Sequence, residues 1–446
     1  MKNITSYQGK NILVLGLGKS GYETAKLLHV LGANVTVNDG KDVSLTNEAK
    51  ELEALEIKVV SGHHPIELLG DIDLIVKNPG IPYHIPFIQE AIARNIQIIT
   101  EVELAYEINE GKIIGITGTN GKTTVTSLIG DMFKHSNQTG LLCGNIGFVA
   151  SLVAQNAKSE DTLITELSSF QLMGIRHFKP HIALITNIYS AHLDYHGTQD
   201  EYVSAKLNIV KNQTAEDYLI FNYKQKELLN NFEIESQIIY FSTEEKVNGS
   251  YIVDGKIYFQ NEFIIDVDEV VLPGKHNLEN ILSSIAAAKL SDIPNESIIA
   301  TLKSFEGIKH RLQFVMTHEN VKYFNDSKAT NTLATTFALD AFHSPIHWLC
   351  GGLDRGNGFE DLDEHVSNVK HMYIFGQTTE KLKAFAESHH IPYSICDDVK
   401  DAVLQTKGNT VAGDTVLLSP ACASWDQYPT YEVRGEDFIQ HVKLLQ

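Results

Sequence analysis

The sequence predicts an α/β protein of three domains, each a parallel sheet whose strands are joined by crossover helices. Short runs of β-branched and apolar residues alternate with helix-length stretches, and this alternation starts afresh near residues 112 and 308. The chain has 446 residues, of which 43% are apolar, so each domain can bury a core of its own. We therefore expect domains at residues 1–108, 109–307 and 308–446.

The first domain carries a glycine-rich loop after its first strand. Strands are predicted at residues 11–15, 35–38 and 74–76, and the domain ends near 103–108. The loop reads Gly16-Leu17-Gly18-Lys19-Ser20-Gly21, and Asp39 ends the second strand. On pattern alone this is a dinucleotide-binding fingerprint, which favours NAD or FAD. The spacing itself establishes only that a diphosphate or similar group can approach the backbone closely, so Asp39 could equally bind the base or ribose of a nucleotide substrate.

The second domain opens with a phosphate-binding pattern. A strand at residues 112–114 leads into Gly115-Ile116-Thr117-Gly118-Thr119-Asn120-Gly121-Lys122-Thr123-Thr124. Gly118 and Gly121 let backbone N–H groups crowd around an anion, and a helix that starts near Thr123 points its positive end at it. Lys122 adds a full charge, and the Thr123 hydroxyl stands where a P-loop ligates nucleotide-bound Mg²⁺. The chain departs from the P-loop pattern at Ile116, where that pattern has glycine.

Two further residues of this domain are candidate metal ligands. Glu166 ends a strand predicted at 161–166, where a carboxylate can reach a metal at the neighbouring phosphate loop. His192 follows a strand predicted at 182–188. A lone acid at a strand end is more often a helix cap and a loop histidine is more often simply hydrogen-bonded, while the two together would equally suit zinc. The phosphate loop favours magnesium.

The rest of the chain carries structural signals. Segments at 250–253 and 256–259 flank Asp254-Gly255, which predicts a hairpin, and the surrounding region 218–270 has no chemical signal. The third domain has strands predicted at 321–325, 346–350, 372–375 and 415–419, separated by helix-length stretches.

Composition narrows the class of partner. Lys and Arg number 36 against 56 Asp and Glu, which gives a net charge of −20. Such a surface repels nucleic acid and anionic membranes, so an anionic ligand needs a local positive site. The four cysteines are scattered without metal-binding spacing, and no apolar run approaches the length of a membrane span. We expect a soluble, cytoplasmic monomer that binds neither nucleic acid nor membranes.

Several segments together resemble the Mur ligases, ATP-dependent amide-bond ligases of cell-wall precursor synthesis. They are the phosphate loop, Thr165-Glu166-Leu167-Ser168-Ser169-Phe170-Gln171-Leu172, Ala191-His192-Leu193-Asp194, Gly274-Lys275-His276-Asn277-Leu278-Glu279-Asn280 and Lys309-His310-Arg311. The first glycine loop is similar to that of the branch that adds D-glutamate to UDP-N-acetylmuramoyl-L-alanine, as are Asp326-Ser327-Lys328-Ala329-Thr330-Asn331 and Ser419-Pro420-Ala421-Cys422-Ala423-Ser424-Trp425-Asp426-Gln427-Tyr428. The resemblance spans all three domains.

The resemblance implies a role for each domain, with ATP and Mg²⁺ as cofactors. It implies an N-terminal Rossmann-like domain that binds the UDP substrate, a central P-loop-type ATPase domain and a C-terminal Rossmann-like domain that binds the amino acid. The implied ATP-binding residues are Gly118, Thr119, Asn120, Gly121, Lys122, Thr123, Thr124, Asn277, Asn280, Arg311 and Asp326. The implied metal ligands are Thr123, Glu166, His192 and, if carbamylated, Lys206. Catalytic roles are implied for Lys122, Glu166, His192, Lys206 and Lys328.

The two other substrates would be UDP-N-acetylmuramoyl-L-alanine and D-glutamate. By resemblance, the UDP substrate would contact Lys19, Ser20, Asp39, Asn78 and, at its muramoyl-alanine end, Asn145. D-Glutamate would be surrounded by Lys328, Thr330, Arg355, Ser424 and Tyr431. Of these, Arg355 lies in a segment that aligns loosely, and Tyr431 stands where the family can have phenylalanine.

The implied reaction passes through an acyl phosphate, which the amine of D-glutamate then attacks, and we expect the third domain to close during it. Three alternatives stay open at this point. A nicotinamide-dependent oxidoreductase would use the first glycine loop and leave the phosphate loop unexplained. A folylpolyglutamate synthetase or another Mur enzyme would share the ATP site and differ in the C-terminal motifs. A non-catalytic nucleotide-binding scaffold would have no use for metal ligands.

Overall fold

The computed structural model describes residues 1–191, 193–272, 274–356 and 358–445. These residues form three β-sheets with the helices and loops that connect their strands. The first two sheets belong to one unit, residues 1–305, and the third to a second unit, residues 306–446. The predicted α/β class with mainly parallel sheets is confirmed. The boundary expected between residues 108 and 109 stays a prediction.

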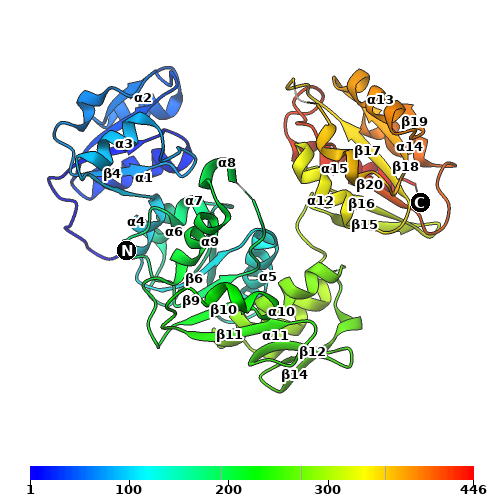
Figure 1. Ribbon diagram of the computed structural model, residues 1–446, viewed down its shortest axis with the longest axis horizontal. Helices are drawn as coiled ribbons and strands as arrows, with labels where there is room; N and C mark the ends of the chain where they lie inside the picture. Colours follow the sequence, from blue (N-terminus) through cyan, green and yellow to red (C-terminus); the bar gives the residue numbers. More distant parts are fainter. Residues whose placement is uncertain (192, 273, 357, 446) are drawn as a thin grey trace. The chain divides into compact units, whose positions relative to one another are not determined.

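The N-terminal sheet is fully parallel, in the order β3-β2-β1-β4-β5. With its helices it forms the blue part of the ribbon in Figure 1. Its strands are β1 (Asn11–Leu15), β2 (Asn34–Asp39), β3 (Lys58–Ser61), β4 (Leu74–Lys77) and β5 (Gln97–Ile99). Its helices are α1 (Lys19–Val30), α2 (Asn47–Ala54) and α3 (Pro86–Ala93), with a 3-10 turn η1 (Ile66–Leu69). Because β1 pairs with both β2 and β4, the glycine loop that follows it lies at the switch in strand order, where doubly wound sheets bind ligands.

The central sheet has nine strands in the order β14-β13-β12-β11-β10-β9-β6-β8-β7. They are β6 (Lys112–Thr117), β7 (Gly140–Gly144), β8 (Thr162–Glu166), β9 (Ile182–Ile185), β10 (Tyr218–Asn222), β11 (Gln237–Ser242), β12 (Gly249–Val253), β13 (Lys256–Phe259) and β14 (Glu262–Asp266). The strands from β7 to β12 are parallel, and β12, β13 and β14 are antiparallel neighbours, so the predicted hairpin around Asp254-Gly255 is confirmed. The stretch at 218–270 thus extends the sheet away from the phosphate loop.

Helices cover both faces of this sheet. They are α4 (Glu101–Ile108), α5 (Lys122–Lys134), α6 (Ala150–Asn156), α7 (Ser169–Leu172), α8 (Leu193–His196), α9 (Gln199–Leu207), α10 (Lys275–Leu290) and α11 (Asn295–Ser304), with 3-10 turns η2 (Asn208–Val210), η3 (Tyr223–Leu229) and η4 (Val267–Glu269). Val125, Leu128 and Ile129 recur at helical spacing on α5 and are fully buried against the sheet and α10. This apolar stripe fixes the direction in which the amino end of α5 points.

One sequence-based boundary differs from the structure. The strand predicted at 182–188 ends at Ile185, because the next residues turn toward the phosphate loop and bond to it. Residues 103–108, where the first block was expected to end, lie in helix α4, which packs on α6. The N-terminal and central parts share buried apolar residues in this region.

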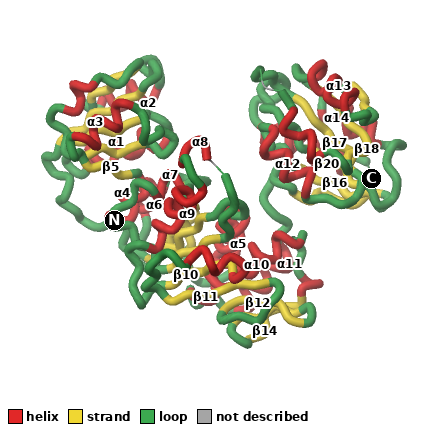
Figure 2. Tube along the Cα trace, viewed as in Figure 1, coloured by secondary structure: helices red, strands yellow, loops and turns green. Residues whose placement is uncertain are grey.

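The second unit is a six-stranded sheet in the order β15-β16-β20-β17-β18-β19. Its strands are β15 (Gln313–His318), β16 (Val321–Asn325), β17 (Ile346–Gly351), β18 (Val369–Phe375), β19 (Tyr393–Ile395) and β20 (Thr415–Leu418). Its helices are α12 (Thr332–Asp340), α13 (Thr379–Ser388), α14 (Val399–Thr406) and α15 (Tyr431–Lys443), with a 3-10 turn η5 (Glu360–His365). Trp348 and Leu349 belong to separate buried clusters, so both faces of this sheet are covered (Figure 2).

Within the described ranges, no helix combines the length and apolar character that crossing a membrane requires.

Candidate active site

The phosphate loop between β6 and α5 depends on two glycines. Gly118 has a φ of 148° and Gly121 a φ of 80°, conformations that side chains rarely adopt. A Cβ on Gly118 would lie 1.9 Å from Thr186 Oγ1, and one on Gly121 would lie 2.2 Å from Asn280 Oδ1. The backbone therefore bends where an anion could approach it, as the sequence predicted.

Residues beyond β9 hold this loop in place. The backbone N–H of Asn120 donates to Asn187 Oδ1 at 2.9 Å, and that of Thr119 donates to Asn187 O at 2.8 Å. Thr186 Oγ1 donates to Asn120 O at 2.5 Å. Sequence reasoning missed Thr186 and Asn187. Their position immediately after a buried strand adjacent to β6 is the signal that could have found them.

Two lysines converge on one carbonyl of the loop. Lys122 Nζ donates to Gly118 O and Thr119 O, each at 2.8 Å, and Lys206 Nζ donates to Gly118 O at 2.7 Å. Lys206 is 2% exposed, and its Nζ lies 4.7 Å from the centre of the Tyr202 ring. Burial, and then the nearby charge of Lys122, hold the pKa of Lys206 well below its usual value. The fold thus brings together two lysines that are 84 positions apart in sequence (206 − 122 = 84).

Glu166 lies beside the loop at the carboxyl end of β8. It is 1% exposed and pairs with Ile116 of the adjacent strand β6. Its Oε1 accepts from Asn145 Nδ2 at 2.8 Å, while its buried Oε2 has no hydrogen-bond partner in the described part of the chain. A buried carboxylate oxygen without a donor suits a cation. Glu166 and the Thr123 hydroxyl at the start of α5 therefore fit a divalent metal ion held together with a phosphate group.

The other predicted metal ligand, His192, lies outside the described residues. No group of three or more His, Cys, Asp or Glu side chains that could hold a metal ion occurs within the residues the structure describes.

Helix α10 supplies the amide side chains predicted to contact the nucleotide. Asn280 Nδ2 donates to Asn277 Oδ1 at 3.0 Å, and Asn280 faces Gly121. Asn277 and Asn280 are three residues apart, so they lie on one face of α10, near the amino end that meets the phosphate loop. Those predicted residues of the central part whose contacts are given above thus lie around one loop: Lys122, Glu166, Lys206, Asn277 and Asn280.

The glycine loop of the N-terminal sheet is organised differently. The backbone N–H of Leu17 donates to Asp39 Oδ2 at 2.8 Å, and that of Lys41 donates to Asp39 Oδ1 at 2.9 Å. Both carboxylate oxygens of Asp39 thus accept backbone hydrogen bonds. Asn78 Nδ2 donates to Ser20 Oγ at 3.4 Å, which ties this loop to the turn after β4.

Lys19, the remaining predicted residue of this loop, lies at the start of α1, and its Nζ is 5.7 Å from the centre of the Phe148 ring. Phe148 belongs to the central part and is 62% exposed. The four predicted UDP contacts of this domain therefore lie on three neighbouring segments at the carboxyl edge of the sheet: the start of α1, the end of β2 and the turn after β4.

In the second unit, the predicted residues lie on loops at the carboxyl edge of the sheet. Asp326 follows β16, accepts from Ser419 Oγ at 2.9 Å and from the backbone N–H of Leu312 at 3.1 Å, and is buried. Burial raises the pKa of Asp326 to about 7 despite these bonds and the charge of Arg311. Arg311 itself is exposed on the segment before β15.

The predicted D-glutamate residues belong to four segments of this unit, one of which is the start of α15, where Tyr431 lies. Lys328 and Thr330 lie in one turn, where the backbone N–H of Thr330 donates to Lys328 O at 2.9 Å. Arg355 is exposed, with its guanidinium 4.9 Å from the centre of the Trp425 ring. Ser424 is buried, and its hydroxyl has no partner among the described residues.

One residue that sequence reasoning missed connects three of these segments. The fully buried Arg434 donates from Nε to Ser327 Oγ and from Nη2 to Ser327 O and Cys422 O, each at 3.0 Å. Ser327 Oγ in turn donates to the carbonyl of Tyr431 at 2.7 Å. The loops that carry Lys328, Ser424 and Tyr431 are thus bonded to one another. An arginine on the inner face of a helix gives no sequence signal of such a role.

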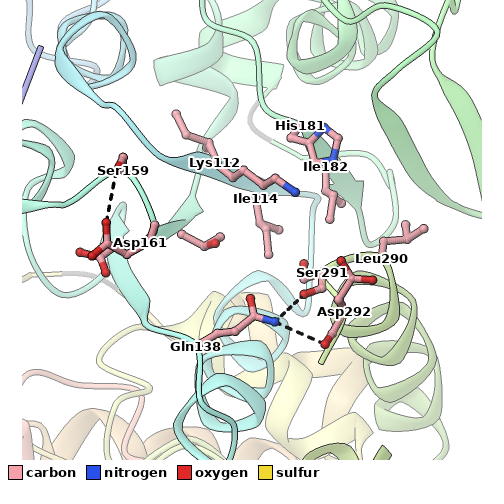
Figure 3. A pocket seen from close by; sticks show the side chains of 13 residues that line it. Lys112, Ile114, Gln138, Ser159, Asp161, His181, Ile182, Leu290, Ser291 and Asp292 are labelled. Carbon is pink, nitrogen blue, oxygen red and sulfur yellow. Dashed lines mark hydrogen bonds between the residues drawn. The ribbon is translucent and has the colours of Figure 1, made fainter. Parts of the chain in front are cut away.

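The central sheet also has a cavity of about 240 Å³ at its opposite edge (Figure 3). It is lined by residues at the beginnings of strands, such as Lys112 and Ile182, and by Asp161. Gln138 Nε2 donates across it to Ser291 O at 2.9 Å and Asp292 O at 3.3 Å. Because the phosphate loop follows the other end of β6, this cavity is separate from the site described above.

Comparison with known sequences covers most of the chain. Residues 10–100 match the Mur ligase MurD-like N-terminal domain, residues 116–288 the Mur ligase middle domain, and residues 310–422 the Mur ligase glutamate ligase domain. The chain is 70% identical over 445 residues to the UDP-N-acetylmuramoylalanine–D-glutamate ligase of Macrococcus caseolyticus (strain JCSC5402), with 100% of both chains covered. It is 57% identical over 443 residues to the ligase of that name from Staphylococcus aureus (strain JH9), with 99% of both covered.

Solved structures share the fold at much lower identity. UDP-N-acetylmuramate-alanine ligase MurC from Thermotoga maritima has a TM-score of 0.56 at 17% identity, covering 98% of this chain and 100% of that one. MurF ligase from the same organism, in complex with ADP, has a TM-score of 0.54 at 15% identity, covering 99% and 97%. Three matched domains, together with 70% identity over the whole length of a ligase from Macrococcus caseolyticus, lead to one conclusion: the chain belongs to the Mur ligase family.

Proposed function

We propose that this protein joins D-glutamate to UDP-N-acetylmuramoyl-L-alanine at the expense of ATP, as a step in making peptidoglycan precursors. The observation that carries this function is the 70% identity, over the whole of both chains, to a protein named UDP-N-acetylmuramoylalanine–D-glutamate ligase. The residues around the phosphate loop support the ATP-dependent part of the proposal. They combine two lysines with a buried carboxylate, which an oxidoreductase using the first glycine loop would not need.

The first step transfers the γ-phosphoryl group of ATP to the alanyl carboxylate of the UDP substrate. A carboxylate oxygen forms a bond to phosphorus as the bond to the β-phosphate oxygen breaks, and ADP leaves. Lys122, the backbone N–H groups of the loop and the positive end of α5 would neutralise the oxygens, since both reactants are anions. Glu166 and Thr123 would hold a Mg²⁺ ion, which when bound neutralises further charge on the phosphate oxygens.

Lys206 is proposed to act as a carbamate. Its buried amine has a lowered pKa, which favours the neutral form that reacts with carbon dioxide. The nitrogen would form a bond to the carbon of CO₂ as one C=O π bond opens to a carboxylate oxygen, and the nitrogen would lose a proton to solvent. The modified side chain would carry a negative charge beside the phosphate loop, where its amine now meets Gly118 O at 2.7 Å. This would turn a repulsive neighbour of Lys122 into an attractive one.

In the second step the neutral amine of D-glutamate attacks the acyl carbon. The new C–N bond forms, the amine loses a proton, and inorganic phosphate leaves with the electrons of the broken C–O bond. Lys328, Thr330, Arg355, Ser424 and Tyr431 are the residues proposed to bind D-glutamate. The cationic side chains of Lys328 and Arg355 suit a substrate with two carboxylates. The Ser424 hydroxyl, which has no hydrogen-bond partner among the described residues, can donate to the substrate.

We further propose that the protein works as a monomer in the cytoplasm, where ATP and the nucleotide-linked substrate are available.

Phosphate release tests the proposed reaction directly. The protein is mixed with MgATP, UDP-N-acetylmuramoyl-L-alanine and either D- or L-glutamate, and phosphate and the amide product are measured. Release that requires the UDP substrate and D-glutamate is expected. Turnover with L-glutamate, or with a different UDP-peptide substrate, would place the chain in another branch of the family.

A further inference from the structure

The turn at residues 78–81, which follows β4, packs directly on the first glycine loop. A Cβ on Gly16 would lie 2.8 Å from Asn78 Cβ and 3.1 Å from Ile81 Cδ1, so the two segments are in close contact. The backbone N–H of Asn78 donates to Leu15 O at 2.8 Å, and that of Ile81 to Asn78 O at 3.1 Å. Any ligand seated on the glycine loop therefore depends on the shape of this turn.

Lys77, the last residue of β4, donates hydrogen bonds to three backbone carbonyls of the turn. Its side chain is 1% exposed, and its Nζ donates to Asn78 O at 3.1 Å, Pro79 O at 3.3 Å and Ile81 O at 2.7 Å. Lys77 forms no salt bridge with any carboxylate in the described ranges of the chain. Burial of an ammonium group without a carboxylate partner is unfavourable. The hydrogen bonds to the turn and the Tyr83 ring, whose centre lies 4.6 Å from Lys77 Nζ, are the contacts that offset this cost, so the position of Lys77 is tied to the turn.

Tyr195 holds the same turn from the central part of the unit. Its hydroxyl lies 3.1 Å from Ile81 O and 3.3 Å from Pro79 O, so it can donate to either carbonyl. Burial raises the pKa of Tyr195 to about 12, which keeps the hydroxyl proton in place. The ring is fixed by Phe170, whose centre is 4.3 Å away. The carbonyl of Ile81 thus accepts from both the N-terminal sheet and helix α8.

We propose that Lys77 and Tyr195 are positioning residues that hold the 78–81 turn in the shape that receives the uridine diphosphate group of the substrate. This inference rests on the proposed function. With its carbonyls drawn onto Lys77 and Tyr195, the turn presents the Asn78 side chain to Ser20 of the glycine loop, 3.4 Å away. Neither positioning residue needs to touch the substrate.

Binding of each nucleotide separately tests this inference. Isothermal titration of the full-length protein with UDP-N-acetylmuramoyl-L-alanine, and separately with MgADP, is compared for the natural protein, Lys77→Met and Tyr195→Phe. We expect the UDP substrate to bind about tenfold more weakly to Lys77→Met and about threefold more weakly to Tyr195→Phe, with MgADP binding unchanged in both. Lys211→Met is the matched control, because Lys211 also donates to a backbone carbonyl, that of Ile175, away from this turn.

The outcomes separate this inference from the proposed function. If the natural protein does not bind the UDP substrate, the proposed function fails and the inference with it. If it binds but both variants bind equally well, or lose MgADP affinity to the same extent, the positioning role is overturned while the proposed function stands. Tyr195→Phe removes a single oxygen atom, so it decides the matter should Lys77→Met fail to fold.

Discussion

The first unit contains two glycine loops that look alike in sequence and differ in chemistry. Both follow a central parallel strand and open a helix, at residues 16–21 and 118–121. Beside the N-terminal loop the nearby acid, Asp39, accepts from the backbone N–H groups of Leu17, in the loop, and of Lys41, after β2. In the central loop the nearby acid, Glu166, keeps one buried oxygen without a partner among the described residues, and two lysines meet at Gly118 O. Glycine spacing sets how closely a phosphate can approach, whereas the charged side chains around the loop decide what can happen to it.

The largest difference between the loops should appear when each loses its lysine. We expect Lys122→Ala to lower phosphate release at least about 10³-fold, because the transferred phosphoryl group loses its main protein cation. Lys19→Ala, the corresponding change in the N-terminal loop, should lower the affinity for the UDP substrate about tenfold and spare turnover at saturation. Steady-state assays that vary each substrate measure both effects.

Lys134→Ala is the control for these variants, since Lys134 lies at the far end of the same helix and pairs with Asp131 on the surface. It should behave like the natural protein. Loss of turnover in Lys19→Ala with little change in Lys122→Ala would reverse the assignment of the two loops.

The second largest effect should follow from Glu166→Gln. Glutamine keeps an oxygen that can accept from Asn145 but removes the negative charge, so Mg²⁺ should half-saturate activity at a concentration at least about tenfold higher. Asp39→Asn makes the same chemical change at the N-terminal loop and should leave the Mg²⁺ requirement unaltered. A magnesium titration of both variants at saturating ATP decides this. An equal shift in the two would mean that Glu166 is not a metal ligand.

Replacing one glycine of each loop by alanine tests whether the two loops bind different ligands. Gly118→Ala places a Cβ against Thr186, and Gly16→Ala places one against Asn78. We expect Gly118→Ala to weaken MgADP binding about tenfold or more with the UDP substrate unaffected, and Gly16→Ala to show the opposite pattern. Titration calorimetry with both ligands on both variants gives the four affinities. If either variant lost both ligands equally, the loops would not be independent binding elements.

The smallest effect concerns pH and the lysine beside the N-terminal loop. Burial lowers the pKa of Lys77 to about 7, so the unfolded chain holds this proton more tightly than the folded one. Lys77 therefore weakens folding most below pH 7, and the penalty shrinks as the pH rises toward the pKa of an unfolded lysine. Between pH 7 and 8.5 the free energy of unfolding of the natural protein should rise by about 1–2 kcal/mol more than that of Lys77→Met. Urea unfolding at several pH values measures this, and a constant difference would contradict the lowered pKa.

Local pattern was enough to predict the backbone of both loops. The strand at 11–15, the phosphate loop and the turn at Asp254-Gly255 appear where the sequence places them, because each depends on neighbouring residues. The end of β9 was predicted three residues too late, since only the folded sheet brings Thr186 and Asn187 to the loop.

Buried cations were harder to predict. Lys77 and Arg434 look like ordinary helix or strand residues in the sequence, and their partners are backbone carbonyls, which every residue has. Nothing in the residue types therefore marks those contacts in advance. Lys206 was singled out by its resemblance to a family position, and the sequence alone would have left it on a solvated helix face, whereas it is almost fully buried.

The shared acceptor at Gly118 also bears on selectivity. The ammonium group of Lys122 donates to two carbonyl groups of its own loop. An incoming anion must displace those carbonyl groups before it gains the lysine, so a singly charged ion such as chloride has little to offer in exchange. A polyphosphate, with several negative oxygens, can complete the exchange, so we expect the loop to discriminate between anions by charge before any contact with the purine is made.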